Sequence, residues 1–146
     1  MMKLSLKVAL SATLLMSAFG SAIYAADPYE NPMNDTPGTA YTKSQGQIFG
    51  GYLWANDYDW YRFYTAKTAT QSVHFAPNDN QSYQVLVFDN PNSGTGPIAT
   101  LKVSNGAGVY HSLQFPAVAG KQYYVLVTSG GGLSGTPFYS LWIDNQ

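Results

Sequence analysis

Cysteine is absent from this chain of 146 residues, and charged residues are few, at 10% of the sequence. The absence of cysteine excludes a disulfide framework, a thiolate metal site and a lipid anchor attached through cysteine. The seven basic residues are scattered and form no basic patch, which argues against nucleic acid as a partner. A protein without disulfides must be held together by packing, with or without help from a bound ion.

Long apolar runs are also missing, except near the N-terminus. Lys3 and Lys7 precede an almost wholly apolar stretch over residues 8–19, and small residues dominate residues 17–25. This order is typical of a secretory signal peptide over residues 1–25, with cleavage expected after Ala25. An uncleaved membrane anchor is the alternative, although the apolar run is shorter than the roughly 20 residues of a spanning helix. The sequence thus predicts a secreted or periplasmic protein that has no membrane contact after cleavage.

The expected mature chain, residues 26–146, has the size of one ordinary domain. Its five basic and eight acidic residues give a net charge of about −3. Because charge is sparse and tyrosine is abundant, the surface must be wetted by amides, aliphatic hydroxyls and tyrosine hydroxyls. Such a surface suits an extracellular setting and neutral, hydroxyl-rich ligands.

Short apolar stretches separated by turn-forming residues fill the chain after an extended lead-in over residues 26–41. Pro28, Pro32 and Pro37 argue against a helix in this lead-in. Strands are expected at residues 47–54, 60–65, 71–76, 83–88, 98–103, 109–115, 123–127 and 138–143, and the pair Gly50-Gly51 predicts a bulge or bend in the first of them. About eight short strands at regular intervals predict an all-β protein, an antiparallel, jelly-roll-like β-sandwich over residues 42–146.

Strand alternation divides the side chains between the core and the surface. Tyr61 and Phe63 are expected to face the core, as are three further sets: Val73 and Phe75; Tyr83, Val85 and Val87; Tyr139, Leu141 and Ile143. The aromatic residues expected to face outwards are Trp60, Tyr64, Tyr124 and Trp142. Exposed flat rings stack on sugar rings or on proline-rich protein, so these four residues are the predicted ligand-binding set. The alternative is that loops cover the rings, or that the rings stabilise one another across strands.

Several motifs in a fixed order resemble the bacterial pre-peptidase C-terminal (PPC) domain family over residues 31–144. They are Asn34-Asp35-Thr36-Pro37 with Ala40, the strand Asp57–Phe63, Val87-Phe88-Asp89, Ala119–Val127 and Tyr139–Ile143. Each motif is weak alone, whereas their order and spacing together are fairly specific. The acid that usually precedes the first motif is displaced here to Glu30.

The resemblance implies a jelly-roll sandwich of the kind attached to secreted proteases, where it serves secretion, folding or substrate attachment rather than catalysis. The collagen-binding domains of bacterial collagenases are distant relatives, and they hold calcium near their N-terminal linker. By this resemblance the chain is an exported, non-catalytic attachment module.

Oxygen-bearing side chains are expected to meet where the lead-in reaches the second strand. Asn34 and Asp35 lie in the lead-in, and Asp57 and Asp59 lie at the start of that strand. If the lead-in folds back over the strand, four side chains with oxygen ligands converge, and calcium takes six to eight oxygen ligands. The sequence therefore predicts a calcium site at these residues. The alternative is that they form ordinary turns and strand starts.

No motif marks an enzyme. Ser72 and His111 could be joined to an aspartate as a Ser-His-Asp arrangement, but there is no Gly-x-Ser-x-Gly elbow and no His-Glu-x-x-His sequence. Asp57 and Asp59 are a conceivable glycosidase pair, although at a rim rather than in a cleft. The tract 130–132 predicts a flexible hairpin loop, because no lysine or helix follows it to make a phosphate cradle.

These observations predict a non-catalytic binding module for an extracellular polysaccharide or protein. One alternative is an accessory protein that supports the secretion or stability of a separate secreted protease. A second is a small hydrolase built on Asp57 and Asp59.

Overall fold

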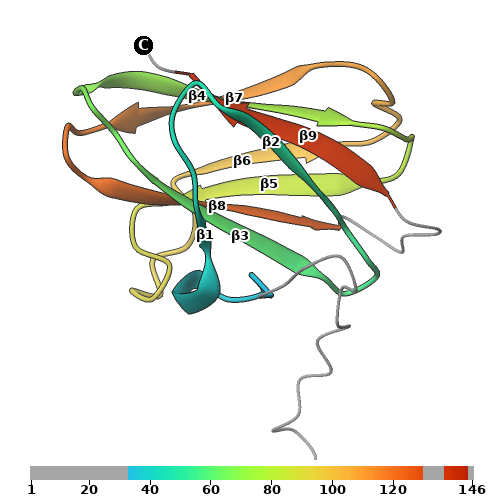
Figure 1. Ribbon diagram of the computed structural model, residues 1–146, viewed down its shortest axis with the longest axis horizontal. Coiled ribbons are helices and arrows are strands. Elements are labelled where there is room, and N and C mark those ends of the chain that lie inside the picture. The colour runs from blue at the N-terminus through green and yellow to red at the C-terminus, as the bar shows by residue number, and fades with distance from the viewer. Residues whose placement is uncertain (1–32, 130–136, 145–146) are drawn as a thin grey trace, which may run out of the picture.

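The chain folds as two stacked β-sheets in the computed structural model, which describes residues 33–129 and 137–144 (Figure 1). Sheet A has the strand order β1-β3-β8-β5-β6, and sheet B has the order β2-β9-β4-β7. The elements are η1 (Pro37–Thr39), β1 (Tyr41–Thr42), β2 (Ile48–Tyr52), β3 (Tyr58–Tyr64), β4 (Ala69–Pro77), β5 (Tyr83–Phe88), β6 (Ala99–Val103), β7 (His111–Ala117), β8 (Gln122–Ser129) and β9 (Phe138–Ile143). The predicted all-β sandwich is confirmed. The predicted signal peptide and the glycine tract 130–132 lie outside the described residues.

All the predicted strands are present, and one more, β1, precedes them. This short strand pairs in parallel with β3, with Tyr41 opposite Tyr61 and Thr42 opposite Arg62. The Arg62 Nε donates to Thr42 Oγ1 at 2.9 Å across this pair. The end of the lead-in is therefore built into sheet A, and the sandwich is antiparallel except at this edge.

The expectation of no helix in the lead-in is wrong at η1, a single 3-10 turn. Thr36 caps it by accepting the Thr39 N–H, and the Thr39 side chain accepts the Thr36 N–H in return. Pro37 occupies the first helical position, where its missing N–H costs nothing. Among the described residues no helix is long and apolar enough to cross a membrane.

Of the two predictions for Gly50-Gly51, the bulge is wrong, because β2 pairs with β9 in unbroken register from Ile48 opposite Trp142 to Tyr52 opposite Phe138. Instead, the absence of a side chain at each glycine leaves space for groups of neighbouring strands. A Cβ atom at Gly50 would lie 3.2 Å from the Phe138 ring on the outer face of sheet B, besides colliding with the Tyr139 carbonyl. A Cβ at Gly51 would meet side chains between the sheets.

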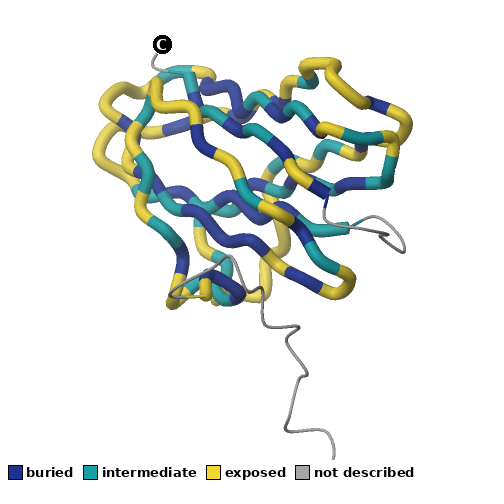
Figure 2. Tube along the Cα trace, turned by 45° about the vertical axis from the view of Figure 1, so that its right-hand side comes forward, coloured by how far each residue is buried: buried dark blue, intermediate teal, exposed yellow. Residues whose placement is uncertain are grey.

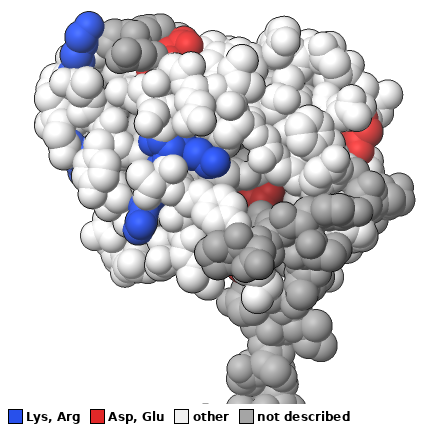
Figure 3. Space-filling model, viewed as in Figure 1, with Lys and Arg blue, Asp and Glu red and all other residues white. Residues whose placement is uncertain are grey.

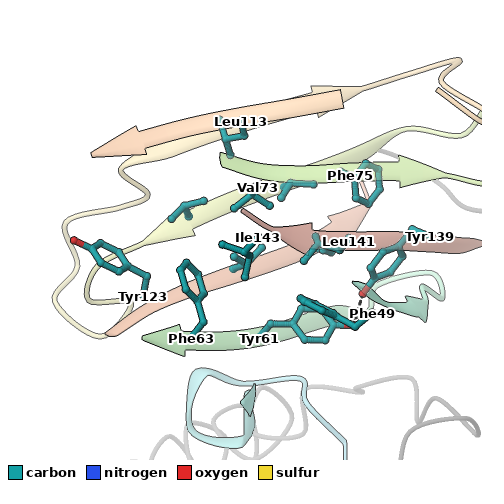
Figure 4. Packing of buried hydrophobic residues seen from close by; sticks show 14 of the residues in the cluster. Phe49, Tyr61, Phe63, Val73, Phe75, Leu113, Tyr123, Tyr139, Leu141 and Ile143 are labelled. Carbon is teal, nitrogen blue, oxygen red and sulfur yellow. Dashed lines mark hydrogen bonds between the residues drawn. The ribbon is translucent and has the colours of Figure 1, made fainter. Parts of the chain in front are cut away.

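The core lies between the two sheets and follows the predicted alternation (Figures 2 and 4). Tyr61 and Phe63 are 1% and 0% exposed. The other predicted inward residues are buried as well: Val73, Phe75, Tyr83, Val85, Val87, Tyr139, Leu141 and Ile143. Aromatic rings dominate the contacts, with Phe63 lying 6.0 Å from Tyr123 and 6.2 Å from Phe115 between ring centroids. Packing of large rings thus takes the place of disulfides in this chain.

Candidate functional site

The lead-in folds back against β3, as the predicted ion site requires. The Trp60 N–H donates to the Asn34 carbonyl at 2.9 Å, and the Asn34 side-chain amide donates to the Trp60 carbonyl at 3.2 Å. Asn34 is therefore held beside the residue that follows Asp59. All four predicted ligands are buried: Asn34, Asp35, Asp57 and Asp59.

The Asp57 carboxylate closes the turn between β2 and β3. One oxygen accepts the Trp54 N–H at 3.1 Å and the other accepts the Tyr58 N–H at 2.9 Å. Asn56, between them, has a φ angle of 64°, a left-handed conformation that asparagine tolerates well. Asp57 therefore has the turn-forming role that was the alternative to ion binding.

The Asp59 side chain points between the sheets, with the same parity along β3 as Tyr61. It accepts a hydrogen bond from the Tyr139 hydroxyl. This hydroxyl lies 2.7 Å from that of Tyr61, and Figure 4 shows the two tyrosine rings within the core. Burial raises the pKa of Tyr139 well above its ordinary value, and the negative charge of Asp59 adds to the shift. Both causes favour the neutral, hydrogen-bond-donating form of Tyr139. A buried carboxylate and two tyrosines thus join β3 of sheet A to β9 of sheet B.

This arrangement predicts that the protein loses stability in alkali. Folding raises the pKa of such a tyrosine above the value of about 10 that it has in the unfolded chain. Its contribution to the free energy of unfolding is complete below that unfolded value and is lost as the pH rises towards the folded pKa. For Tyr139 alone, the free energy of unfolding should fall by about 1.4 kcal/mol per pH unit above about pH 10. Urea unfolding between about pH 9 and pH 11 measures this slope. The Tyr139→Phe variant should show a slope shallower by that amount, and an unchanged slope would contradict the assignment.

No three histidine, aspartate or glutamate side chains come together as a metal site would require within residues 33–129 and 137–144. A calcium ion at the lead-in would therefore need amide and backbone carbonyl oxygens beside the carboxylates of Asp35 and Asp59. Both oxygens of Asp57 already accept backbone hydrogen bonds. The calcium site stays a prediction.

The four predicted ligand-binding rings lie on opposite faces of the sandwich. Trp60, Tyr64 and Tyr124 point outwards from sheet A, whereas Trp142 points outwards from sheet B. Trp60 is only 9% exposed, because it packs with Ala40 and Leu126 in a second small cluster. The outward direction of Trp60 was predicted correctly, but its exposure was not. The alternative, that other parts of the chain cover the rings or that the rings pack across strands, describes Trp60. The four rings do not form one platform.

A different set of apolar side chains forms a patch on the outer face of sheet B. We call this patch the sheet-B face, and it comprises Ile48, Tyr52, Tyr110, Phe138 and Trp142. Ile48 pairs with Trp142 across β2 and β9, and the Tyr52 and Phe138 rings are 5.1 Å apart. The Tyr110 ring meets Trp142 edge-on at 5.1 Å and is 71% exposed. Sequence reasoning found only Trp142. The parity of β2 around the inward Phe49 was the signal that could have added Ile48 and Tyr52.

Charge is absent from the strands that carry this face. None of β2, β4, β7 and β9 contains a lysine, arginine, aspartate or glutamate, whereas sheet A carries Asp59, Arg62 and Lys102. The view in Figure 3 shows how sparse and scattered the charged side chains are on the visible surface. The strands that carry the sheet-B face are therefore uncharged, and the carboxylate of Asp144, directly after β9, lies beside the face through its contact with His74.

Trp142 lies beside three side chains of sheet B that are joined by hydrogen bonds: Ser112, His74 and Asp144. Trp142 pairs with His74 across β9 and β4, and His74 pairs with Ser112 across β4 and β7. The His74 Nε2 lies 2.7 Å from Asp144 Oδ2, and Nδ1 lies 2.8 Å from Ser112 Oγ. The Ser-His-Asp arrangement considered for Ser72 and His111 is thus formed by other residues. Ser72 is buried, and the His111 ring lies against the position of Gly106.

Comparisons in sequence gave no match with protein-family profiles and no significant match with curated proteins. Among solved structures, the pre-peptidase C-terminal domain of collagenase from Bacillus anthracis is similar, with a TM-score of 0.58 at 17% identity over 72% of this chain and 94% of that chain. The Yersinia pseudotuberculosis-derived mitogen gives a TM-score of 0.47 at 13% identity, over 68% of this chain and 85% of that chain. The carbohydrate-binding module CBM36, solved with calcium and xylotriose, gives 0.40 at 15% identity, over 68% and 91%. The last two are too distant to support an argument. The chain therefore has the fold of the pre-peptidase C-terminal domain, in agreement with the resemblance of its sequence motifs.

Proposed function

We propose that this protein is an exported module that binds a neutral extracellular polysaccharide on its sheet-B face, and that this binding involves no catalysis. The observation that carries the proposal is the exposed aromatic patch around Trp142 on a sheet whose four strands have no charged residue. Exposed apolar patches on soluble proteins commonly mark binding surfaces. Aromatic rings stack on the apolar faces of sugar rings, and the absence of fixed charge suits a ligand that is itself uncharged. The predicted signal peptide supports a secreted or periplasmic location.

Affinity electrophoresis tests the proposal. The mature chain is run through gels that contain a neutral galactomannan, a neutral β-glucan or the acidic polysaccharide alginate. We expect retardation by a neutral polymer and little by alginate. Loss of retardation in every gel, together with capture of the protein by immobilised matrix proteins, would favour a protein ligand instead. No retardation and no capture would remove the proposal.

Replacing Trp142 with alanine should weaken polysaccharide binding by about 30-fold, because a central aromatic anchor commonly contributes about 2 kcal/mol. Tyr110→Ala removes a more exposed ring from the same face and should weaken binding by a smaller factor. Tyr64→Ala is the comparison for the opposite sheet, since Tyr64 is 59% exposed on sheet A. Binding that depends on Tyr64 and not on Trp142 would place the ligand on sheet A. Circular dichroism of each variant checks that the fold is retained.

Calcium at the lead-in is a separate part of the proposal. The fold-back of the lead-in and the buried oxygen-bearing side chains of Asn34, Asp35 and Asp59 support it. Calcium at a hundredfold excess over its dissociation constant should stabilise the protein by about 2.7 kcal/mol and raise its melting temperature. EDTA should reverse the gain, and Asp35→Asn should reduce it. Identical melting curves with calcium and with EDTA would exclude the site.

A further inference from the structure

Ser112, His74 and Asp144 have the order of a nucleophile, a base and an orienting acid. Backbone pairing fixes Ser112 directly opposite His74 on neighbouring strands, and Asp144 directly follows β9, which pairs with the other side of β4. Both separations, 2.8 Å from Ser112 Oγ to Nδ1 and 2.7 Å from Nε2 to Asp144 Oδ2, are hydrogen-bond distances. Three strands of one sheet therefore position the three groups.

The hydrogen-bonding chemistry of these groups determines where the protons lie. An ionised carboxylate can only accept, so the proton of neutral His74 must be on Nε2, facing Asp144. The other nitrogen, Nδ1, then carries a lone pair, and the Ser112 hydroxyl must donate to it. This proton arrangement lets His74 act as a base towards Ser112, with Asp144 holding the tautomer.

The Trp142 ring restrains the His74 imidazole, whereas the Ser112 hydroxyl is accessible to solvent. The Trp142 ring stacks on the His74 ring at 4.7 Å with an interplanar angle of 13°. The His74 side chain is 19% exposed, whereas Ser112 is exposed on the outer face of β7. Trp142 is thus a positioning residue that limits the rotation of the imidazole. Among the described residues, the titratable groups around the His74 ring are Asp144, directly after β9, and Tyr110, which contacts the Trp142 ring.

We propose that Ser112 is a base-activated nucleophile that accepts the acyl group of a small ester approaching over Trp142. Ser112 Oγ forms a bond to the ester carbonyl carbon while its proton moves to His74 Nδ1. His74 returns this proton to the departing alcohol as the ester C–O bond breaks. Water then attacks the acyl-serine, with His74 again taking and returning the proton, and releases the carboxylic acid and free Ser112. The chemistry does not require a bound polysaccharide, although both ligands would contact Trp142.

The expected rate gain is moderate because the site lies on an open sheet. General-base assistance contributes about 10²–10⁴-fold. Strand β7 is at the edge of sheet B, and an edge strand presents unpaired N–H groups that can donate to an oxyanion. Esters with a good leaving group, such as p-nitrophenyl acetate, should therefore react measurably, whereas amides should not.

Diisopropyl fluorophosphate tests the nucleophile directly, because Ser112 Oγ would displace fluoride and leave a phosphoryl adduct detectable by intact mass. We expect one adduct, mapped by peptide mass spectrometry to Ser112 and absent in Ser112→Ala. Ser104→Ala is the matched control, since Ser104 is an exposed serine that hydrogen-bonds to Ser82 instead of a histidine, and labelling should be unchanged. No adduct on Ser112 would overturn the proposal.

The role of His74 is tested by rate and by pH. Labelling of Ser112 and hydrolysis of p-nitrophenyl acetate should slow by at least about 100-fold in His74→Gln. In the unmodified protein, both rates should be lower in acid than at neutral pH, because a protonated imidazole cannot accept the Ser112 proton. In Asp144→Asn the new side-chain amide can donate to Nε2, which places the proton of His74 on Nδ1. Nδ1 can then no longer accept the Ser112 proton, so labelling should slow. An adduct that forms equally fast in His74→Gln, or at a rate independent of pH, would overturn the proposal. The pH profile decides the matter if His74→Gln does not fold.

Discussion

Replacing Gly51 with alanine should lower the free energy of unfolding by about 3 kcal/mol or more. The new Cβ atom would lie 2.8 Å from the Tyr139 hydroxyl and 2.9 Å from the Tyr61 hydroxyl, and 3.0 Å from the nearer Asp59 oxygen. Contacts this short force the buried groups apart. Crowding a packed core costs about 1–3 kcal/mol, and weakening a hydrogen bond to a charged group costs about 1.5–3 kcal/mol.

The matched control for this variant is Gly38→Ala. The nearest atom to a Cβ at Gly38 is Thr36 Oγ1 at 3.8 Å, an ordinary contact, so this change should alter stability by less than about 0.5 kcal/mol. Urea unfolding of both variants, followed by tryptophan fluorescence, gives the comparison. Equal stabilities for the two variants would show that Asp59, Tyr61 and Tyr139 do not form the packed network described above.

Alternation along single strands allowed the core to be predicted, but the sequence alone does not reveal which strands are neighbours. The inward positions of Tyr61 and Phe63 followed from parity within β3, and Asp59 has the same parity. Its role was nevertheless missed, because its partner Tyr139 is 80 residues away in the chain. The role of the Gly50-Gly51 pair was missed for the same reason, since the atoms that need the space belong to other strands, β9 and β3.

The candidate site illustrates the same limit. Ser112 and Asp144 are 38 and 70 residues from His74, and they meet it because β4 lies between β7 and β9. The sequence contained the right residue types for such a chain, but no local motif relates them. The exposure of Trp60 was also unpredictable from β3, because its covering comes from the lead-in. Local patterns thus predicted faces correctly, while long-range pairing determined which side chains are available for function.

Replacing Trp60 with alanine should therefore damage folding rather than ligand binding. The Trp60 ring packs 5.3 Å from Phe88 and shares its cluster with Ala40 and Leu126, on the face of sheet A covered by the lead-in. Truncating a buried tryptophan costs about 3–5 kcal/mol. The Trp60 backbone also holds Asn34 through two hydrogen bonds, so loosening the cluster should release the lead-in. We expect the variant to unfold at lower urea concentration and to be cut more readily by a protease in residues 33–40.

Tyr64→Ala is the matched control for Trp60, because Tyr64 lies on the same strand and the same face but is 59% exposed. Its loss should change stability by less than about 0.5 kcal/mol and leave protease resistance of the lead-in unchanged. If Trp60→Ala instead kept full stability and lost polysaccharide binding, Trp60 would be a ligand-contacting ring. In that case the ligand would bind on sheet A rather than on sheet B.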